Sequence, residues 1–336
     1  MDKTKKSIGY KVSIFDPTSI HGKEMKKVLI ERGFPYESVK LIDIEEKLGT
    51  VAEFDDEATI VTLADTEALT ESDVIFFCGN PKASAAITKR YKELDFFAFD
   101  LSRSQNESEN YKYFVSPQDR EILRKWNGIY ATPHPVAVPL IRTLSKLEEE
   151  FGLLFASATA MNAVSEIGFE GISSLHKQTT DLMNFVPLDE KQRIFNLFPR
   201  QTGYADEIGQ IRRHVTDSEK LKNLEFTLSL IDVPIFFGAA IVVYVEMESS
   251  SSKDFAWNKL FTGDDGFKFD GNVSAGDDPL GPVDIAETDL LHVQLLNIEE
   301  DNSKLWFWIL ADNIRLCSVI NIVQLAEAVL GLDENR

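Results

Sequence analysis

The sequence contains few of the residues from which metal centres and disulfide frameworks are built. Its 336 residues include two cysteines and five histidines. The histidines show no His-x-x-His or His-x-x-x-His spacing, and Cys78 and Cys317 lie far apart, so no zinc motif is present. Both cysteines lie within apolar runs, which favours free, buried thiols in a reducing compartment. We therefore expect a cytoplasmic protein without a bound metal.

Positive charge is also scarce. The chain has 35 Lys and Arg residues against 55 Asp and Glu residues, which gives a formal net charge of -20. This excess of acid disfavours nucleic acid and anionic membrane as partners. No apolar run reaches the length of a transmembrane helix, and the segment Met1–Ser7 is not followed by the apolar core of a signal peptide.

Familiar catalytic and phosphate-binding motifs are absent as well. The sequence has no Gly-x-Ser-x-Gly elbow and no Gly-Lys-Ser/Thr loop. A Ser-His-Asp site stays open, because its members can lie far apart in a sequence. The Asp-rich segment Gly263–Gly281 lacks the spacing of a calcium loop, and we expect a solvated, exposed loop there.

The first 130 residues alternate between short β-type apolar runs and helical segments. Strands are expected at Tyr10–Phe15, Glu57–Leu63, Asp73–Phe77, Asp95–Phe99 and Tyr113–Val115, and helices at Ser19–Arg32 and Pro81–Glu93. Strands that alternate with helices predict a parallel, doubly wound sheet.

Longer strand-like runs dominate the rest of the chain. They cover Leu153–Val164, Leu224–Val233, Ile235–Met247, His292–Ile298 and Lys304–Ala311, with helices expected at Ile167–Met183, Leu188–Phe198 and Ile314–Leu330. Phe236–Val245 is apolar at nearly every position, which predicts a strand covered on both faces. The chain is thus expected to be an α/β protein with one domain at 1–130 plus 312–336 and a second, α+β domain at 131–311.

One strand–turn–helix stretch has the form of a reactive site. Gly128–Val136 joins a short apolar strand to an amphipathic helix over Ala137–Phe151. The N-terminus of such a helix presents unpaired backbone N–H groups, which suit a nucleophile or an anion. The turn itself, Thr132-Pro133-His134-Pro135, holds neither Cys nor Ser.

Seven stretches in a fixed order resemble the aspartate-semialdehyde dehydrogenase family, from Tyr10 to Leu330, and most of all its Usg-type members. The stretches are Val12–Val28 with Arg32-Gly-Phe-Pro35, Ser72–Phe77, Tyr130–Pro133, Ala163-Val-Ser165, Asn196–Pro199, Val233–Gly238 and Leu305–Arg315. The resemblance implies a Rossmann-like NADP-binding domain and an α+β domain that forms a dimer by sheet packing. It also implies reductive dephosphorylation of an aspartyl phosphate through a thioacyl-enzyme.

The cofactor turn of that family is altered in this chain. The family's Gly-Ala-Thr-Gly-x-x-Gly segment corresponds to Asp16–Gly22, where only Thr18 and Gly22 match. Asp16 places a carboxylate where phosphate charge belongs, and Pro17 removes a donor. We expect Asp16 or Thr18 to cap the helix and no cofactor to bind. If a nucleotide did bind, the resemblance names NADP, held by Thr18, Ser19, Ile20, Gly79 and Asn313.

The catalytic positions that the resemblance assigns also lack the functional groups that the family uses. The nucleophilic Cys is Pro135, and the Gln that orients the substrate is Asn162. The Arg that clamps the substrate carboxylate is Asp232, and the acid/base His is Ala239. His134 is the only substitute candidate. The thioacyl reaction of the family therefore cannot run at this site.

Three hypotheses of function follow. The first is a non-catalytic structural or regulatory homologue, either homodimeric or paired with an active family enzyme. The second is a sensor that holds an acidic metabolite or a nucleotide near Thr18, Gly79 and Asn313. The third is an oxidoreductase of the aldehyde/acyl-phosphate class, which serves amino-acid biosynthesis, with altered residues that include His134 or His21.

Overall fold

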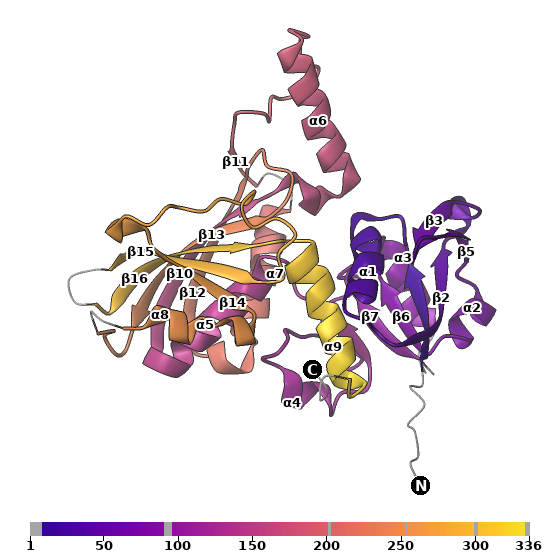
Figure 1. Ribbon diagram of the computed structural model, residues 1–336, viewed down its shortest axis with the longest axis horizontal. Coiled ribbons are helices and arrows are strands. Elements are labelled where there is room, and N and C mark those ends of the chain that lie inside the picture. Colours follow the sequence, from indigo (N-terminus) through magenta and orange to yellow (C-terminus); the bar gives the residue numbers. More distant parts are fainter. Residues whose placement is uncertain (1–8, 91–95, 201–202, 253–254, 299–301, 333–336) are drawn as a thin grey trace. The chain divides into compact units, whose positions relative to one another are not determined.

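The computed structural model describes residues 9–90, 96–200, 203–252, 255–298 and 302–332 (Figure 1). The chain divides into two units, which are described separately below. Unit 1 is Met1–Pro133 with Ser318–Arg336, and unit 2 is His134–Cys317. The segment Met1–Ser7, Asp95, residues 91–93 and the end of 312–336 lie outside the described residues.

Unit 1 is built on a seven-stranded sheet in the order β5-β2-β1-β6-β7-β9-β8, with every pairing parallel. Its strands are β1 Tyr10–Phe15, β2 Tyr36–Asp43, β5 Thr62–Leu63, β6 Val74–Phe77, β7 Phe97–Asp100, β8 Tyr111–Tyr113 and β9 Ile129–Ala131. Its helices are α1 Ile20–Glu31, α2 Thr66–Thr70, α3 Pro81–Arg90, α4 Arg120–Leu123 and α9 Asn321–Val329. A separate hairpin pairs β3 Val51–Phe54 with β4 Glu57–Ile60. This parallel sheet confirms the predicted Rossmann-like architecture.

Aromatic packing forms much of the core of unit 1. Phe76 and Phe99 stack with ring centroids 5.5 Å apart, and Tyr130 continues the stack at 5.2 Å from Phe99.

The helix α9 returns to this unit, where Glu327 accepts hydrogen bonds from the guanidinium of Arg32 just after α1. Residues from the two ends of the chain thus complete one core.

Unit 2 contains a mixed seven-stranded sheet, called sheet C here, in the order β11-β12-β10-β13-β16-β15-β14. Its strands are β10 Leu153–Asn162, β11 Phe198–Pro199, β12 Glu225–Asp232, β13 Ala239–Met247, β14 Phe267–Asn272, β15 Leu291–Ile298 and β16 Lys304–Ala311. Its α-helices are α5 Ala137–Phe151, α6 Phe169–Met183, α7 Tyr204–Thr216 and α8 Trp257–Leu260. This arrangement confirms the predicted second sheet with accompanying helices.

Several sequence-based predictions about unit 2 were wrong. Residues 188–197 form no helix, and the buried amide of Gln178 on α6 instead bonds to their backbone at Lys191 O and Arg193 N. The segment expected as a solvated loop contains the edge strand β14. There the Asp270 side chain is only 8% exposed, and its carboxylate bonds to Nδ1 of His292 at 2.7 Å.

The apolar run at Phe236–Val245 also differs from its prediction. The strand β13 begins only at Ala239, and burial alternates along it, so one of its faces is partly open. Phe236 and Phe237 precede the strand and are 39% and 43% exposed. The final helix is divided as well, because a π-helical turn at Arg315–Ile320 precedes α9.

Across the described part of the chain, no helix combines the length and the apolar character that a membrane crossing requires. The same residues hold no group of three His, Cys, Asp or Glu side chains arranged to bind a metal ion.

Candidate functional site

The sheet of unit 1 has a topological switch point between β1 and β6, because β1 pairs with β2 on one side and with β6 on the other. Open α/β sheets bind ligands at the carboxyl ends of their strands at such a point. The loops that follow β1 and β6 meet there, where Ser19 Oγ donates to the carbonyl of Cys78 at 3.2 Å.

A carboxylate of the chain itself lies in this crevice. Asp16 is 8% exposed and adopts φ +58°, and its Oδ2 accepts the backbone N–H of Asn80 at 3.1 Å. A Cβ on Gly79 would lie 1.9 Å from the same Oδ2, so a larger residue there would force the Asp16 side chain to move. The chain's own anion thus occupies a donor that an anionic ligand would need.

The first helix is capped by Ser19, so the prediction that Asp16 or Thr18 caps it was wrong. Ser19 Oγ accepts the N–H of Gly22 at 3.0 Å, as expected for an N-cap residue. Thr18 Oγ1 instead accepts from Lys47 Nζ at 3.2 Å. The retained glycine has a structural reason, since a Cβ on Gly22 would lie 2.3 Å from the carbonyl oxygen of Asp16.

Asp43 is a residue of this crevice that our reading of the sequence missed. It ends β2 next to Asp16, because Phe15 pairs with Ile42. It is 2% exposed, its Oδ1 accepts the N–H of Ile44, and its Oδ2 has no hydrogen-bond partner among the described residues. Burial and the nearby Asp16 carboxylate raise its pKa. The missed signal is an acidic residue about 20 positions after the phosphate turn, which binds a ribose hydroxyl in dinucleotide folds.

In unit 2, the family positions lie along one row of sheet C. Asn162 at the end of β10 pairs with Asp232 on β12 and with Ala239 on β13. Side chains paired across neighbouring strands share a face, so these three point to the same side of the sheet. Both amide atoms of Asn162 are buried without a hydrogen-bond partner in the part of the chain that the structure describes.

His134 lies in the turn that precedes α5, whose N-cap residue is Val136. Its Nδ1 accepts the N–H of Val136 at 3.1 Å, and its carbonyl oxygen accepts the N–H groups of Ala137 and Val138. Because Nδ1 is an acceptor, the neutral ring carries its proton on Nε2, which lies 3.0 Å from Glu207 Oε1. The N–H groups of residues 136–138 are therefore already paired, and Pro135 lies buried between them and His134.

An ion-pair chain continues from His134 to the row. Glu207 on α7 also accepts from Arg200 Nε at 3.0 Å, and Arg200 Nη1 donates to Asp232 Oδ1 at 2.9 Å. Burial lowers the pKa of Arg200, but the hydrogen bond to Asp232 and the charge of Glu207 raise it more. Neither Arg200 nor Glu207 was singled out from the sequence, because neither matched a motif.

A pocket of roughly 610 Å³ opens beside Asp232 within unit 2. Its polar and charged lining residues are Glu166, Lys191, Arg193, Asn196, Arg200 and Asp232. Lys191 also lies over the ring of Phe198, at 3.9 Å from the centroid. The lining thus combines three basic side chains with two acidic ones.

The predicted cofactor residues fall into two groups. Thr18, Ser19, Ile20 and Gly79 meet at the switch point of unit 1, whereas Asn313 belongs to unit 2. The amide of Asn313 is 1% exposed and links its own unit: Oδ1 accepts from Gly238 N, and Nδ2 donates to Ser165 Oγ and Glu166 Oε1. A structural role accounts for the buried amide of Asn313.

Comparison with known proteins agrees with this geometry. The family model described as semialdehyde dehydrogenase, dimerisation domain, matches residues 144–316, which is just over half of the chain. The chain therefore belongs to the semialdehyde dehydrogenase family, as the resemblance predicted.

Individual relatives match over nearly their whole length. Aspartate-semialdehyde dehydrogenase of Rickettsia conorii is 24% identical over 96% of this chain and 98% of its own. A USG-1 protein homolog of Pseudomonas aeruginosa is 25% identical over 95% of this chain and 97% of its own. The structure of a probable aspartate-semialdehyde dehydrogenase from P. aeruginosa shares the fold, with a TM-score of 0.87, 23% identity and coverage of 96% and 99%.

Proposed function

We propose that this chain is a catalytically vacant member of its family, which acts in the cytoplasm as a homodimeric structural or regulatory protein. The observation that carries the proposal is the Asp16 carboxylate bonded to the N–H of Asn80 at the switch point. Phosphate groups of a dinucleotide would meet a negative charge there in place of a free donor.

The second unit supports the loss of chemistry. The nucleophile position is Pro135, which has no reactive atom, and the acid/base position is Ala239. The carboxylate-clamp position is Asp232, and Arg200 neutralises it. His134 does not replace the nucleophile, because both of its ring nitrogens already have partners.

The homodimer is supported by the partly open face of sheet C. On that face, Ser157 pairs with Thr227 and Thr159 pairs with Ser229 through their hydroxyl groups. Tyr244 and Trp306 lie beside each other with ring centroids 4.9 Å apart. A partly exposed face of small hydroxyls and aromatic rings suits packing against a second sheet. The location in the cytoplasm rests on the two free, buried thiols.

One structural feature supports each of the two other hypotheses, the sensor and the altered oxidoreductase. The unpartnered Oδ2 of Asp43 favours a sensor that binds a nucleotide ribose. The pocket beside Asp232 favours an oxidoreductase with altered chemistry.

Calorimetric titration with NADP and with NAD tests the proposal. We expect no saturable heat at cofactor concentrations up to about 1 mM, and no rise in the thermal midpoint. Saturable binding of either cofactor to the native protein would contradict the vacant-site proposal. The Asp16→Gly variant is the matched comparison, because it removes the carboxylate and leaves a residue that accepts φ +58°.

Catalysis is tested by adding back the missing nucleophile. Pro135→Cys should show no oxidation of aspartate semialdehyde in the presence of NADP and phosphate, because the acid/base and clamp positions remain Ala239 and Asp232. Turnover by the unaltered chain would instead favour the altered oxidoreductase.

A further inference from the structure

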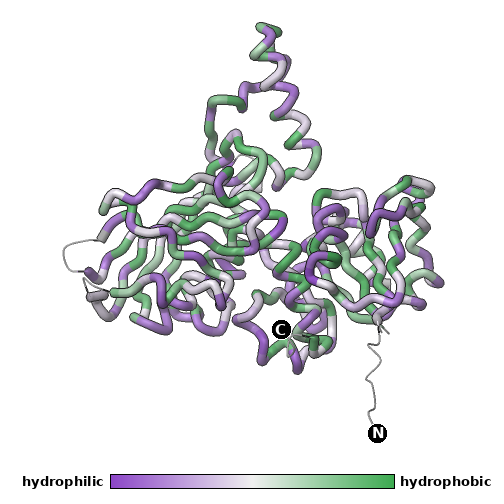
Figure 2. The backbone as a smooth tube through the Cα atoms, in the orientation of Figure 1, coloured by the Kyte–Doolittle hydropathy of each residue, from purple (hydrophilic) through white to green (hydrophobic). Residues whose placement is uncertain are grey.

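Two aspartates lie at neighbouring strand ends on the carboxyl edge of the sheet in unit 1. Asp16 directly follows β1 and Asp43 ends β2, and in this parallel pair Phe15 is opposite Ile42. The N–H of Asp16 donates to the carbonyl of Ile42 at 3.1 Å, so the pairing continues past the end of β1. On the other side of β1, the strand β6 is hydrophobic throughout (Figure 2), so no charge of that strand offsets the two carboxylates.

Each of these carboxylates has one oxygen that is bonded and one that is not. Asp16 Oδ2 accepts the N–H of Asn80, and Asp43 Oδ1 accepts the N–H of Ile44. Within the described ranges of the chain, Asp16 Oδ1 and Asp43 Oδ2 accept no hydrogen bond, although the two residues are only 8% and 2% exposed. Burying a carboxylate oxygen without a partner is costly. Both oxygens therefore favour a donor or a cation from outside the chain.

Asp100 shows how the same sheet edge satisfies a buried carboxylate with its own residues. It ends β7, and its Oδ2 accepts from the hydroxyl of Tyr111 at 2.7 Å. Ser102 and Ser104 each donate to it through both their backbone N–H and their hydroxyl group. The pair at the ends of β1 and β2 has no comparable set of donors among the described residues.

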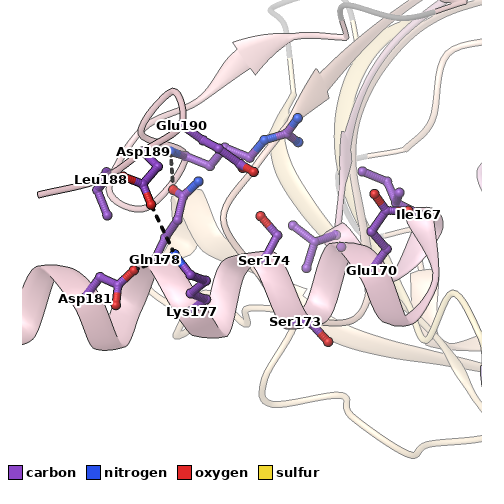
Figure 3. Close-up of a pocket in the computed structure, with 13 residues that line it drawn as sticks. Ile167, Glu170, Ser173, Ser174, Lys177, Gln178, Asp181, Leu188, Asp189 and Glu190 are labelled. Carbon is purple, nitrogen blue, oxygen red and sulfur yellow. Dashed lines mark hydrogen bonds and ion pairs between the residues drawn. The ribbon is translucent and has the colours of Figure 1, made fainter. Parts of the chain in front are cut away.

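Charged groups along α6 in unit 2 are likewise balanced within the chain. Lys177 pairs with Asp181 at 2.9 Å and lies 4.0 Å from Asp189, as Figure 3 shows. The amide of Gln178 on the same helix bonds to the returning segment through both its oxygen and its nitrogen. Although this region lines a cavity of roughly 600 Å³, its groups already serve one another.

The charge around Asp16 and Asp43 is predominantly negative. Burial raises the pKa of Asp43, a backbone hydrogen bond lowers it, and the carboxylates of Asp16 and Glu46 raise it further. The ammonium of Lys47 opposes them, at 3.8 Å from Asp16 Oδ1 and 3.2 Å from Thr18 Oγ1. The Lys47 side chain is 47% exposed, so water screens its charge. Three carboxylates and one screened ammonium leave an excess of negative charge.

We propose that Asp16 and Asp43 together bind a magnesium ion at this edge of unit 1. Oxygen donors suit hard cations, and Mg²⁺ is often held by one or two carboxylates while water fills its other positions. The described residues hold no group of three His, Cys, Asp or Glu side chains arranged around a metal, and a two-carboxylate site does not require one. The Asp16 carboxylate that disfavours a phosphate group thus favours a cation.

This inference goes beyond the proposed function and differs from the expectation, drawn from the sequence, of a protein without a metal. Calorimetric titration of the unaltered, metal-free protein with MgCl₂ tests it. We expect saturable binding of about one ion per chain, and a rise of about 2 °C in the thermal midpoint at about ten times the dissociation constant. Titration with NaCl at the same ionic strength corrects for screening of the net charge of -20.

Two variants each remove one of the two charges. Asp43→Asn and Asp16→Asn should both bind Mg²⁺ at least about tenfold more weakly. Asparagine tolerates φ +58° at position 16 and keeps an oxygen for the N–H of Asn80. In metal-free buffer at pH 7, Asp43→Asn should nevertheless be more stable than the unaltered protein. Weaker binding by a more stable protein would exclude misfolding as the cause.

Two further variants test the position of the site. Lys47→Met removes the ammonium beside Asp16, and we expect it to bind Mg²⁺ at least about threefold more tightly. Asp56 is exposed in the hairpin turn of the same unit, so Asp56→Asn should keep an affinity within about twofold of the unaltered protein.

No saturable heat up to about 20 mM MgCl₂ would overturn the proposal. Unchanged affinity in both Asp16→Asn and Asp43→Asn would also overturn it, because the ion would then bind elsewhere on the acidic surface. Neither result would affect the proposed function, because this titration contains no dinucleotide and that proposal is tested by NADP and NAD.

Discussion

The guanidinium of Arg200 lies 2.9 Å from the carboxylate of Asp232, at the end of β12 in sheet C. The family resemblance places a substrate-binding arginine at position 232. This chain instead has the opposite charge there, and an arginine that follows β11 neutralises it. The ion pair with Arg200 thus offsets the charge of Asp232 within the protein.

Removing this arginine should destabilise unit 2. Arg200→Met leaves Asp232 partly buried without this ion pair and takes away one of the partners of Glu207, which keeps its contact with His134. We expect the free energy of unfolding to fall by about 2 to 3 kcal/mol. Urea denaturation at pH 7 measures the change. The exposed Asp264 provides the control, and Asp264→Asn should change stability by less than about 0.5 kcal/mol. A loss below 1 kcal/mol for Arg200→Met would show that the pair contributes little.

The crevice of unit 1 allows a double-mutant cycle. In Gly79→Ala the new methyl group would clash with Asp16 Oδ2, at 1.9 Å from the ideal Cβ position, so we expect a loss of about 1 to 3 kcal/mol. In an Asp16→Gly background the same change should cost at least 1 kcal/mol less. Additive effects in urea denaturation would mean that the two loops do not constrain each other as described.

Asp43 should make stability depend on pH. Its folded pKa is raised by burial and by the charge of Asp16, so the folded protein binds this proton more tightly than the unfolded chain does. Stability is therefore lost as the pH rises from the ordinary aspartate value through the raised one. Asp43→Asn should be more stable than the unaltered protein at pH 7, and the advantage should disappear below about pH 4.

Denaturation curves for both proteins between pH 4 and pH 8 measure this difference. Asp56→Asn serves as the control, because Asp56 is exposed in the hairpin turn of the same unit. An advantage that stays constant over the whole range would rule out ionisation of Asp43 as its source.

Neither thiol should react in the folded protein. Cys78 and Cys317 are fully buried, and burial raises the pKa of each thiol well above its ordinary value. With a disulfide reagent at pH 8 we expect no rapid labelling, and two thiols per chain after unfolding in urea. Fast modification of Cys78 in the native state would show that this thiol is accessible and would contradict the expectation.

The fold was largely predictable from the sequence, because strands such as β1 and β16 have apolar patterns that their burial requires. The strand β2 was missed because polar residues dominate its first half. Segment 188–197 was misassigned because its backbone partners come from Gln178, which no local pattern reveals.

The site was predictable only where a family position existed. The alignment of Asn162, Asp232 and Ala239 in one row follows from strand register, and the resemblance named all three. The compensating residues Arg200 and Glu207 come from elsewhere in the chain, and only the folded structure brings them to that row. Asp43 could have been predicted, because an acidic residue about 20 positions after the phosphate turn can be recognised in the sequence.

In the crevice that we propose to be vacant, the carboxylate of Asp16 would act as an intramolecular competitor of a phosphate group. A group that is covalently part of a chain has an effective concentration in the millimolar range or above at its own binding partner, and dilution does not lower it. A diffusing phosphate ester has to displace this group from the N–H of Asn80 before it can bind. The surface of unit 1 would therefore not change with the concentration of dinucleotide. A protein that binds this unit would meet the same surface at high and at low concentration.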